Sequence, residues 1–139
     1  MAYTTIDDSS AHFQTALYTG NGGTQSITND GNSDLQPDLI WTHDRSSNWY
    51  PNLIDSTRGG TKLIRSSTNI VEATSATAVT AFNSDGFSLG AEQTLNSNTI
   101  THVAWQWKAN GGTTTTNDAS ETSVGSIDSV YQANTTAGF

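Results

Sequence analysis

The clearest alternation of apolar and polar positions in the chain runs from Thr99 to Lys108. Its odd-numbered positions include Thr101, Val103, Trp105 and Trp107, and its even-numbered positions are Ile100, His102, Ala104, Gln106 and Lys108. Side chains along a β-strand point alternately to its two sides, so one face carries two indoles and the other is mostly small or polar. We interpret this segment as a core strand of a β-sandwich, entered from a hairpin turn at Asp85-Gly86.

Shorter alternating runs between turn signals predict further strands. They cover residues 12–19, 24–28, 38–44, 49–55, 61–66, 79–82 and 127–131. Pro51 indicates an edge strand or a bulge, because proline cannot donate to a sheet ladder. Residues 69–80 allow a helical turn, but their β-branched side chains favour a loop followed by a strand. With no long helical pattern, the sequence predicts an all-β fold, an antiparallel β-sandwich.

The 139 residues are enough for one domain with a real core. We predict a polar N-terminal arm at residues 1–10 and a sandwich domain at residues 11–112. A Thr/Ser-rich stretch at residues 113–139 is interpreted as a linker or edge strand that leads towards a further module.

Charge excludes several partners. The formal net charge is −8, and the five cations are scattered along the chain. An extended nucleic-acid backbone and anionic lipid are therefore not expected as partners.

The sequence has no cysteine for disulfides or thiolate metal sites. It also has no apolar run of membrane-spanning length, so membrane insertion is not expected. The first ten residues lack a signal-peptide pattern, so a protein that acts outside cells would have to leave by another route. Assembly into a particle that is released by lysis is one such route.

Five phrases, taken together and in order, carry a resemblance: FQTALYTGNGGTQSI, PDLIWTHDRS, LIDSTRGGTKLI, FNSDGFSLG and VAWQWKANGG. They resemble a repeat-bearing module of tailed-bacteriophage virion proteins, common in marine and cyanobacterial phages and often described as tail fibres. The match spans residues 13–112. It implies a jelly-roll, concanavalin-like or SPRY-like sandwich located in the virion, with other virion proteins as partners. By analogy with fibres it also implies a homo-oligomer, a trimer. It implies no active site.

Catalytic patterns are weak. The candidate carboxylates for glycan hydrolysis, which needs a pair across a cleft, are Asp38, Asp44, Asp55, Asp85 and Glu92. No local pattern places two of them on one strand face, and turn capping explains them more simply. The three histidines have no nucleophile motif around them. We therefore predict no catalytic residues and no enzyme activity.

For metal, residues 29–34 (NDGNSD) supply the oxygen ligands that calcium prefers. Their spacing departs from the EF-hand pattern, and a polar turn is the favoured interpretation. We predict no cofactor and no metal ligands, and keep a calcium ion bridging this loop to Asp85 as an alternative.

An aromatic cluster around one turn is the best binding candidate. We predict ligand-binding residues at His43, Asp44, Arg45, Trp49 and Tyr50. Aromatic rings offer a flat face to a sugar while neighbouring polar groups bond its hydroxyls, and the same residues would suit a protein interface. Trp41, like Trp105 and Trp107, is interpreted as core. For Arg58 we favour an ion pair with Asp55 over contact with an acidic glycan.

These observations predict an interaction module of a phage virion appendage, acting in host-surface attachment through glycan or protein binding. The alternative is a purely structural protein of capsid or tail assembly or decoration. A glycan depolymerase is a third class. The sequence leaves the sugar, the position on the particle and its symmetry open.

Overall fold

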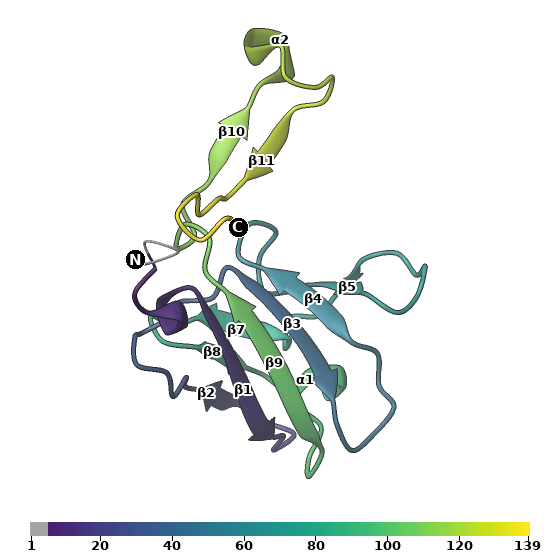
Figure 1. Ribbon diagram of the computed structural model, residues 1–139. Helices are drawn as coiled ribbons and strands as arrows, with labels where there is room; N and C mark the ends of the chain where they lie inside the picture. Colours follow the sequence, from purple (N-terminus) through teal and green to yellow (C-terminus); the bar gives the residue numbers. More distant parts are fainter. Residues whose placement is uncertain (1–5) are drawn as a thin grey trace.

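The computed structural model describes residues 6–139 of the chain, so the predicted arm at residues 1–10 lies partly outside it. Strands dominate (Figure 1). The elements, in order, are a 3-10 turn at Ser9–Ala11, β1 Phe13–Thr19, β2 Gln25–Ile27, β3 Leu39–Asp44, β4 Asn52–Asp55, β5 Lys62–Arg65, β6 Ala73–Thr74, β7 Val79–Phe82, β8 Phe87–Leu89, α1 Gln93–Asn96, β9 Thr101–Trp107, β10 Thr115–Asn117, α2 Ala119–Thr122 and β11 Ser129–Tyr131.

The strands form two layers. The front layer in Figure 1 is a six-stranded sheet in the order β1-β9-β3-β4-β5-β6, and the fainter layer behind it is a three-stranded sheet in the order β2-β8-β7. The strand pairs within both sheets are antiparallel. The prediction of an all-β antiparallel sandwich is therefore confirmed. β9 lies between β1 and β3 and makes seven residue pairs with β1.

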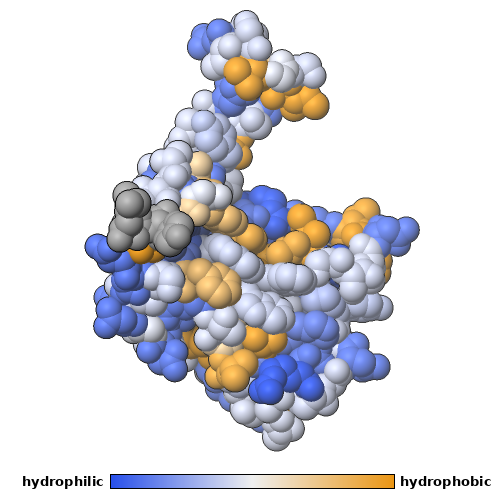
Figure 2. Space-filling view, viewed as in Figure 1, coloured by the Kyte–Doolittle hydropathy of each residue, from blue (hydrophilic) through white to orange (hydrophobic). Residues whose placement is uncertain are grey.

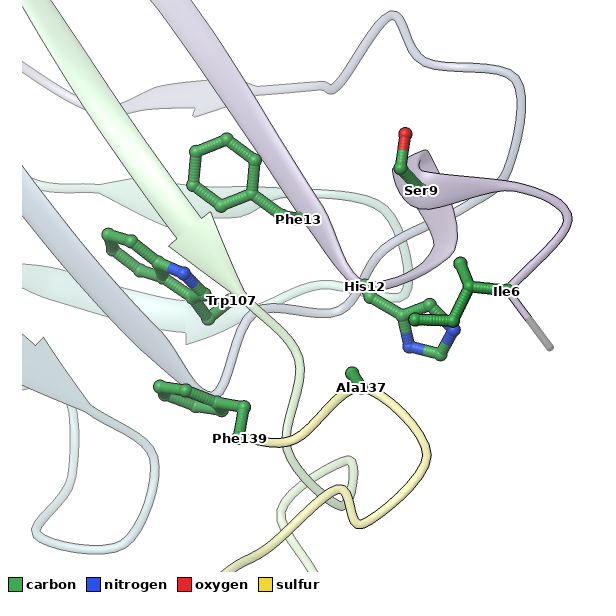
Figure 3. A pocket seen from close by; sticks show the side chains of 7 residues that line it. All are labelled: Ile6, Ser9, His12, Phe13, Trp107, Ala137 and Phe139. Atoms are coloured by element: carbon green, nitrogen blue, oxygen red, sulfur yellow. The ribbon is translucent and has the colours of Figure 1, made fainter. Parts of the chain in front are cut away.

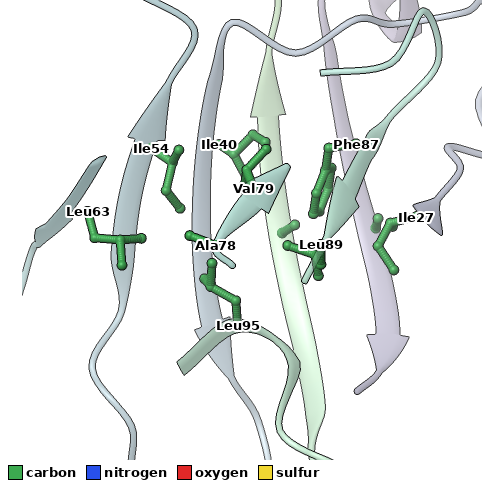
Figure 4. Packing of buried hydrophobic residues seen from close by; sticks show 11 residues of the cluster. Ile27, Ile40, Ile54, Leu63, Ala78, Val79, Phe87, Leu89 and Leu95 are labelled. Carbon is green, nitrogen blue, oxygen red and sulfur yellow. The ribbon is translucent and has the colours of Figure 1, made fainter. Parts of the chain in front are cut away.

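The core lies between the two sheets (Figure 4). Buried apolar side chains from both layers fill it: Ala16, Ile27, Ile40, Ile54, Leu63, Ala78, Val79, Phe87, Leu89, Leu95 and Ala104. Phe87 from the smaller sheet is fully buried, and small side chains stand on the inner face of β1 and β9 at Ala16 and Ala104. A close-packed interior holds a fixed volume, so large residues on one sheet require small ones opposite.

The interpretation of the three tryptophans as core is wrong. Ala104, His102 and Gln106 face the second sheet, so the alternating side chains of β9 place Trp105 and Trp107 on the outer face. Trp41 is also on that face and is 39% exposed. The inner volume opposite β9 is taken by side chains of the smaller sheet, and the indoles are left outside.

Polar side chains complete the inner face of the larger sheet. Gln14, Asn52, His102 and Gln106 are each at most 6% exposed. The amide of Gln14 donates to the carbonyl oxygens of Ser10 and Ser33 and accepts from the Gly31 backbone N–H. Gln106 donates to Asn29 Oδ1 at 2.6 Å. These bonds attach the loop at residues 29–34 to the sheet and satisfy part of the polar layer.

Local predictions were met unevenly. Residues 69–80 contain loop and strand, as expected, with β6 in their middle and the start of β7 at their end. The prediction that Pro51 marks an edge strand or a bulge is wrong, because β4 begins after Pro51 and lies between β3 and β5. The one-turn helices α1 and α2 were not predicted. Glu92 and Asp118 cap their N-termini by accepting backbone N–H bonds.

Residues 113–139, for which a linker or edge strand is expected, contain a separate hairpin. β10 and β11 pair with each other, carry α2 between them and project from the end of β9 (Figure 1). The buried carboxylate of Asp38 holds the base of this hairpin. It accepts the backbone N–H groups of Ala109, Gly111 and Gly112 and the hydroxyl of Ser56, at 2.7–2.8 Å. Gln132 returns the chain to the same place by bonding Ser56 and Gly112.

Candidate functional site

The outer face of the six-stranded sheet is the most distinctive surface of the molecule. Strand register aligns its side chains in rows across β1, β9, β3, β4 and β5. One row is Thr15, Trp105, Trp41, Leu53 and Ile64; the rows beside it are Phe13, Trp107, Leu39 and Asp55, and Leu17, Val103 and His43. We call the residues of these three rows the aromatic face.

Ring contacts connect the centre of the aromatic face. The rings of Trp41 and Trp105 have centroids 5.2 Å apart at 47°, and those of Phe13 and Trp107 are 5.0 Å apart at 53°. Phe139, from the returning C-terminal segment, stacks on Trp107 at 6.2 Å and 18°. Tilted pairs at these distances are favourable aromatic geometry. The contacts hold the rings in fixed positions while leaving part of each in solvent.

The aromatic face is also nearly free of charge. Asp55 is the only Asp, Glu, Lys or Arg in its three rows, and its carboxylate is paired with Arg58 Nε at 2.6 Å. In the space-filling view the centre of this face is white and orange, and strongly hydrophilic side chains lie mainly towards its borders (Figure 2). Although the chain has a formal charge of −8, an uncharged partner meets almost no charged side chain on this face.

Polar donors are interspersed with the rings. Trp41 Nε1 donates to Ser66 Oγ at 3.1 Å, which fixes that indole. Among residues 6–139, the indole N–H groups of Trp105 and Trp107 have no protein acceptor. Thr15, Thr101 and the half-exposed His43 add hydroxyl and imidazole groups on the same side of the sheet. The face can therefore offer stacking and directional hydrogen bonds together.

A pocket of about 250 Å³ lies at the end of the aromatic face where the hairpin begins (Figure 3). Its lining residues are Ile6, Ser9, His12, Phe13, Trp107, Ala137 and Phe139. The Nδ1 atom of His12 lies 3.1 Å from Asn134 Nδ2, so the returning segment also fixes this imidazole. The pocket is smaller than a drug-sized ligand site and suits a single ring.

The five predicted ligand-binding residues do not form one surface. His43 lies on the aromatic face, but Asp44 points to the opposite side and its side chain is fully buried. The Asp44 carboxylate is 3.0 Å from His43 Nδ1 and accepts the Trp49 backbone N–H at 3.3 Å. It therefore fixes the loop between β3 and β4, and a ligand at the surface does not reach it.

The other three predicted residues belong to that loop. Arg45, Trp49 and Tyr50 are exposed, the two aromatics by 38% and 40%. The guanidinium of Arg65 lies 4.8 Å from the centroid of the Tyr50 ring, a cation–π contact that holds the ring. Trp49 and Tyr50 thus remain available to a ligand, but at the border of the larger aromatic face.

The candidate catalytic carboxylates each accept bonds from the protein. Asp38 and Asp44 hold loops as described, Asp85 accepts the Leu35 N–H, and Glu92 caps α1. The predicted ion pair between Asp55 and Arg58 is confirmed, and Arg58 also bonds Glu72 at 2.6 Å. Partial burial lowers the pKa of Arg58, but the hydrogen bonds that Arg58 donates to Glu72 and Asp55 outweigh this effect, so the pKa stands above its usual value.

Three side chains of the loop proposed for calcium are already engaged in hydrogen bonds within the protein. Asn29 Oδ1 accepts from Gln106, while Asn32 and Ser33 donate to Asp8. Within residues 6–139, no cluster of three or more His, Asp or Glu side chains could hold a metal ion. The hydroxyl of Ser10 adds a further bond to Asp8, and these bonds hold the pKa of its carboxyl well below the usual range.

Comparison with known protein families assigns the chain to one family. Residues 8–139 match the model of a family described as a domain of unknown function (DUF7483), and the chain belongs to that family. The matched region takes in both sheets, the hairpin and Phe139. No protein of curated function matches the chain, and no solved structure matches it. In the part of the chain that the structure describes, no helix has the length and apolar character needed to cross a membrane.

Proposed function

We propose that this domain is an interaction module of a phage virion appendage and that it binds an uncharged glycan on its aromatic face. The exposed indole of Trp41, packed against Trp105 at 5.2 Å, carries the proposal. The virion setting rests on the phrases shared with phage virion modules. The resemblance also supports a homo-oligomer on the particle; a trimer by analogy with fibres and the two-fold pairing proposed below are alternatives that the measured oligomeric state distinguishes.

Glycan binding is favoured because of what the aromatic face combines. Sugar rings have apolar C–H faces that stack on aromatic rings, and hydroxyls that need directional partners. The face supplies Trp41, Trp105 and Trp107 for stacking, with Thr15 and His43 beside them. The indole N–H groups of Trp105 and Trp107, which no acceptor within residues 6–139 occupies, can also donate to a ligand. Its lack of cations gives an anionic polysaccharide nothing to pair with, so the ligand class is neutral.

A role in building or decorating the particle is the second candidate. The hairpin favours it, because Val124, Ile127, Val130 and Tyr131 are each at least 48% exposed there. Exposed apolar side chains on a projecting element are typical of a protein contact. This role would bury the hairpin against another virion protein and leave the aromatic face free.

The test is binding of the purified chain to immobilised neutral and acidic polysaccharides of bacterial envelopes, with phage particles stripped of appendages in parallel. We expect saturable binding to a neutral glycan, competed by the free sugar. Trp41→Ala should raise Kd about tenfold or more, as truncation of a central aromatic contact does. Tyr131→Ala, an exposed aromatic on the hairpin, is the matched control and should bind like the wild type.

Two results would contradict the proposal. The first is no saturable binding to any glycan. The second is glycan binding that Trp41→Ala leaves unchanged, which would place the ligand elsewhere. A Trp49→Ala variant then shows whether the loop between β3 and β4 is that place. Binding only to the stripped particles would favour the assembly role.

A further inference from the structure

β1 is an edge strand with few features that would prevent another strand from pairing with it. It is the first strand in the order of the six-stranded sheet, so β9 is its only strand partner among residues 6–139. Its seven residues, Phe13–Thr19, include no charged side chain and no proline. Natural edge strands are normally blunted by charges, prolines or bulges, because open backbone groups attract another strand. A long uncharged edge therefore indicates a pairing surface.

The direction of the open backbone groups follows from the ladder with β9. Gly20 N–H donates to Ile100 C=O, and Lys108 N–H donates to His12 C=O. In an antiparallel pair the bonded residues alternate, so the backbone N–H and C=O groups of even-numbered β1 residues bond β9. The backbone N–H and C=O groups of odd-numbered β1 residues point away from β9, towards the open edge of the sheet. Among residues 6–139, no backbone or side-chain group bonds the outward groups of Phe13, Thr15 and Leu17.

A groove accompanies this edge. It has a volume of about 260 Å³ and is lined by Thr15, Ala16, Leu17, Ile27, Thr28 and Asp30. Leu17 is 63% exposed, the most exposed large hydrophobic side chain of the strands. The smaller sheet leaves the gap between β1 and β2 uncovered, so an added strand would contact side chains of both layers.

We propose that β1 pairs with β1 of a second copy of this chain, antiparallel about a two-fold axis at Thr15. Because the outward groups belong to odd residues, the bonded pairs must join odd to odd. Centring on Thr15 places Phe13 against Leu17 of the second copy and the two Thr15 residues against each other. Aromatic–aliphatic and Thr–Thr neighbours are favourable cross-strand pairs.

Charge permits a second copy at this edge and disfavours it over the rest of the surface. Two chains of formal charge −8 repel one another over most of their surfaces, but the facing strands carry no charge. Asp30 is the one acidic residue among those that line the groove. Salt screens the remaining repulsion, so association should strengthen as ionic strength rises. The contact is isologous and closes as a dimer, and it joins two aromatic faces into one continuous surface.

The oligomeric state of the 139-residue chain tests the proposal. We expect sedimentation equilibrium to show a monomer of 14.7 kDa converting to a dimer within a range of about 1 µM to 1 mM. Thr15→Lys should abolish the dimer, because it sets two like charges against each other at the axis. Thr116→Lys on the exposed hairpin is the control. Unchanged thermal melting would show that Thr15→Lys still folds.

Cross-linking tests the register. The chain has no cysteine, so Thr15→Cys introduces a single reactive thiol. A short thiol-specific cross-linker should join Thr15→Cys chains into dimers. It should not join Thr19→Cys chains, whose thiols would lie about 27 Å apart along the paired strands. A monomer at every concentration, a trimer, a dimer that survives Thr15→Lys, or equal cross-linking of both cysteine variants would overturn the proposal. Glycan binding by Trp41 is measured separately and does not depend on these results.

Discussion

Asp44 on β3 and His102 on β9 stand directly opposite each other on the buried face of the six-stranded sheet. Asp44 is 5% exposed and His102 is fully buried, and the His102 imidazole also stacks on Tyr18 with ring centroids 5.1 Å apart. Burial lowers the pKa of His102, and the negative charge of Asp44 opposes this effect only in part. The net direction is downward, so the folded protein holds this histidine neutral.

The first prediction concerns pH. The unfolded chain binds a proton at His102 near its ordinary pKa of 6.5, whereas the folded chain binds it only at lower pH. The contribution of His102 to the free energy of unfolding should therefore be complete above pH 6.5. It should decrease as the pH falls towards the pKa of His102 in the folded protein. Urea unfolding at several pH values between about 7 and 5 would measure this slope.

His102→Phe is the matching variant. It keeps a ring against Tyr18 and removes the titration, so its stability should vary less over the same pH range. An equal slope in both proteins would contradict the assignment to His102. The lowered pKa of Asp8 has a separate effect, because the contribution of Asp8 to the free energy of unfolding is lost only as the pH falls below about 3.8.

The second prediction concerns Asp38 at the base of the hairpin. Asp38→Ala would leave three backbone N–H groups and the Ser56 hydroxyl without their acceptor. We expect the free energy of unfolding to fall by about 3 kcal/mol or more. Asp38→Asn keeps one acceptor oxygen and should lose less. Faster hydrogen exchange at Ala109, Gly111 and Gly112 would locate the damage; a loss below about 1 kcal/mol in Asp38→Ala would contradict this role.

The third prediction compares two glycines with the same backbone conformation. Gly59 and Gly86 both have φ of +96°, where a side chain is strained. A Cβ at Gly59 would meet nothing within 4 Å, whereas one at Gly86 would clash with the backbone carbonyl of Ile27. Gly59→Ala should therefore cost about 1 kcal/mol and Gly86→Ala clearly more. Similar midpoints in thermal unfolding would show that the turn before β8 can move away from β2.

The fourth prediction separates the two proposed contacts by their salt dependence. Binding of a neutral glycan to the aromatic face should change less than about twofold when salt rises from roughly 0.05 to 0.5 M. Dimerisation through β1 should strengthen over the same range, because two chains of charge −8 approach each other. Titration calorimetry and sedimentation of the same sample would measure both. Glycan binding that weakens steeply with salt would indicate an ionic ligand.

The positions of the strands followed from sequence alone because alternation and turn residues are local signals. β1, β3, β7 and β9 each begin and end within two residues of their predicted bounds. The short helices were missed because single turns have no periodicity to detect. Their only signal was an acidic residue at the N-cap of each, Glu92 and Asp118.

What the sequence by itself determined was the strand pattern, the sandwich class and the presence of two unlike faces on β9. Which face is buried was decided only by tertiary structure, since alternation is symmetric between the two sides of a strand. Phe87, Leu89 and Val79 of the smaller sheet fill the core against Ala16 and Ala104, so the tryptophans lie outside. The same packing turned the Asp44 carboxylate into the interior while the rings of Trp49 and Tyr50 stayed exposed, which no local pattern could show.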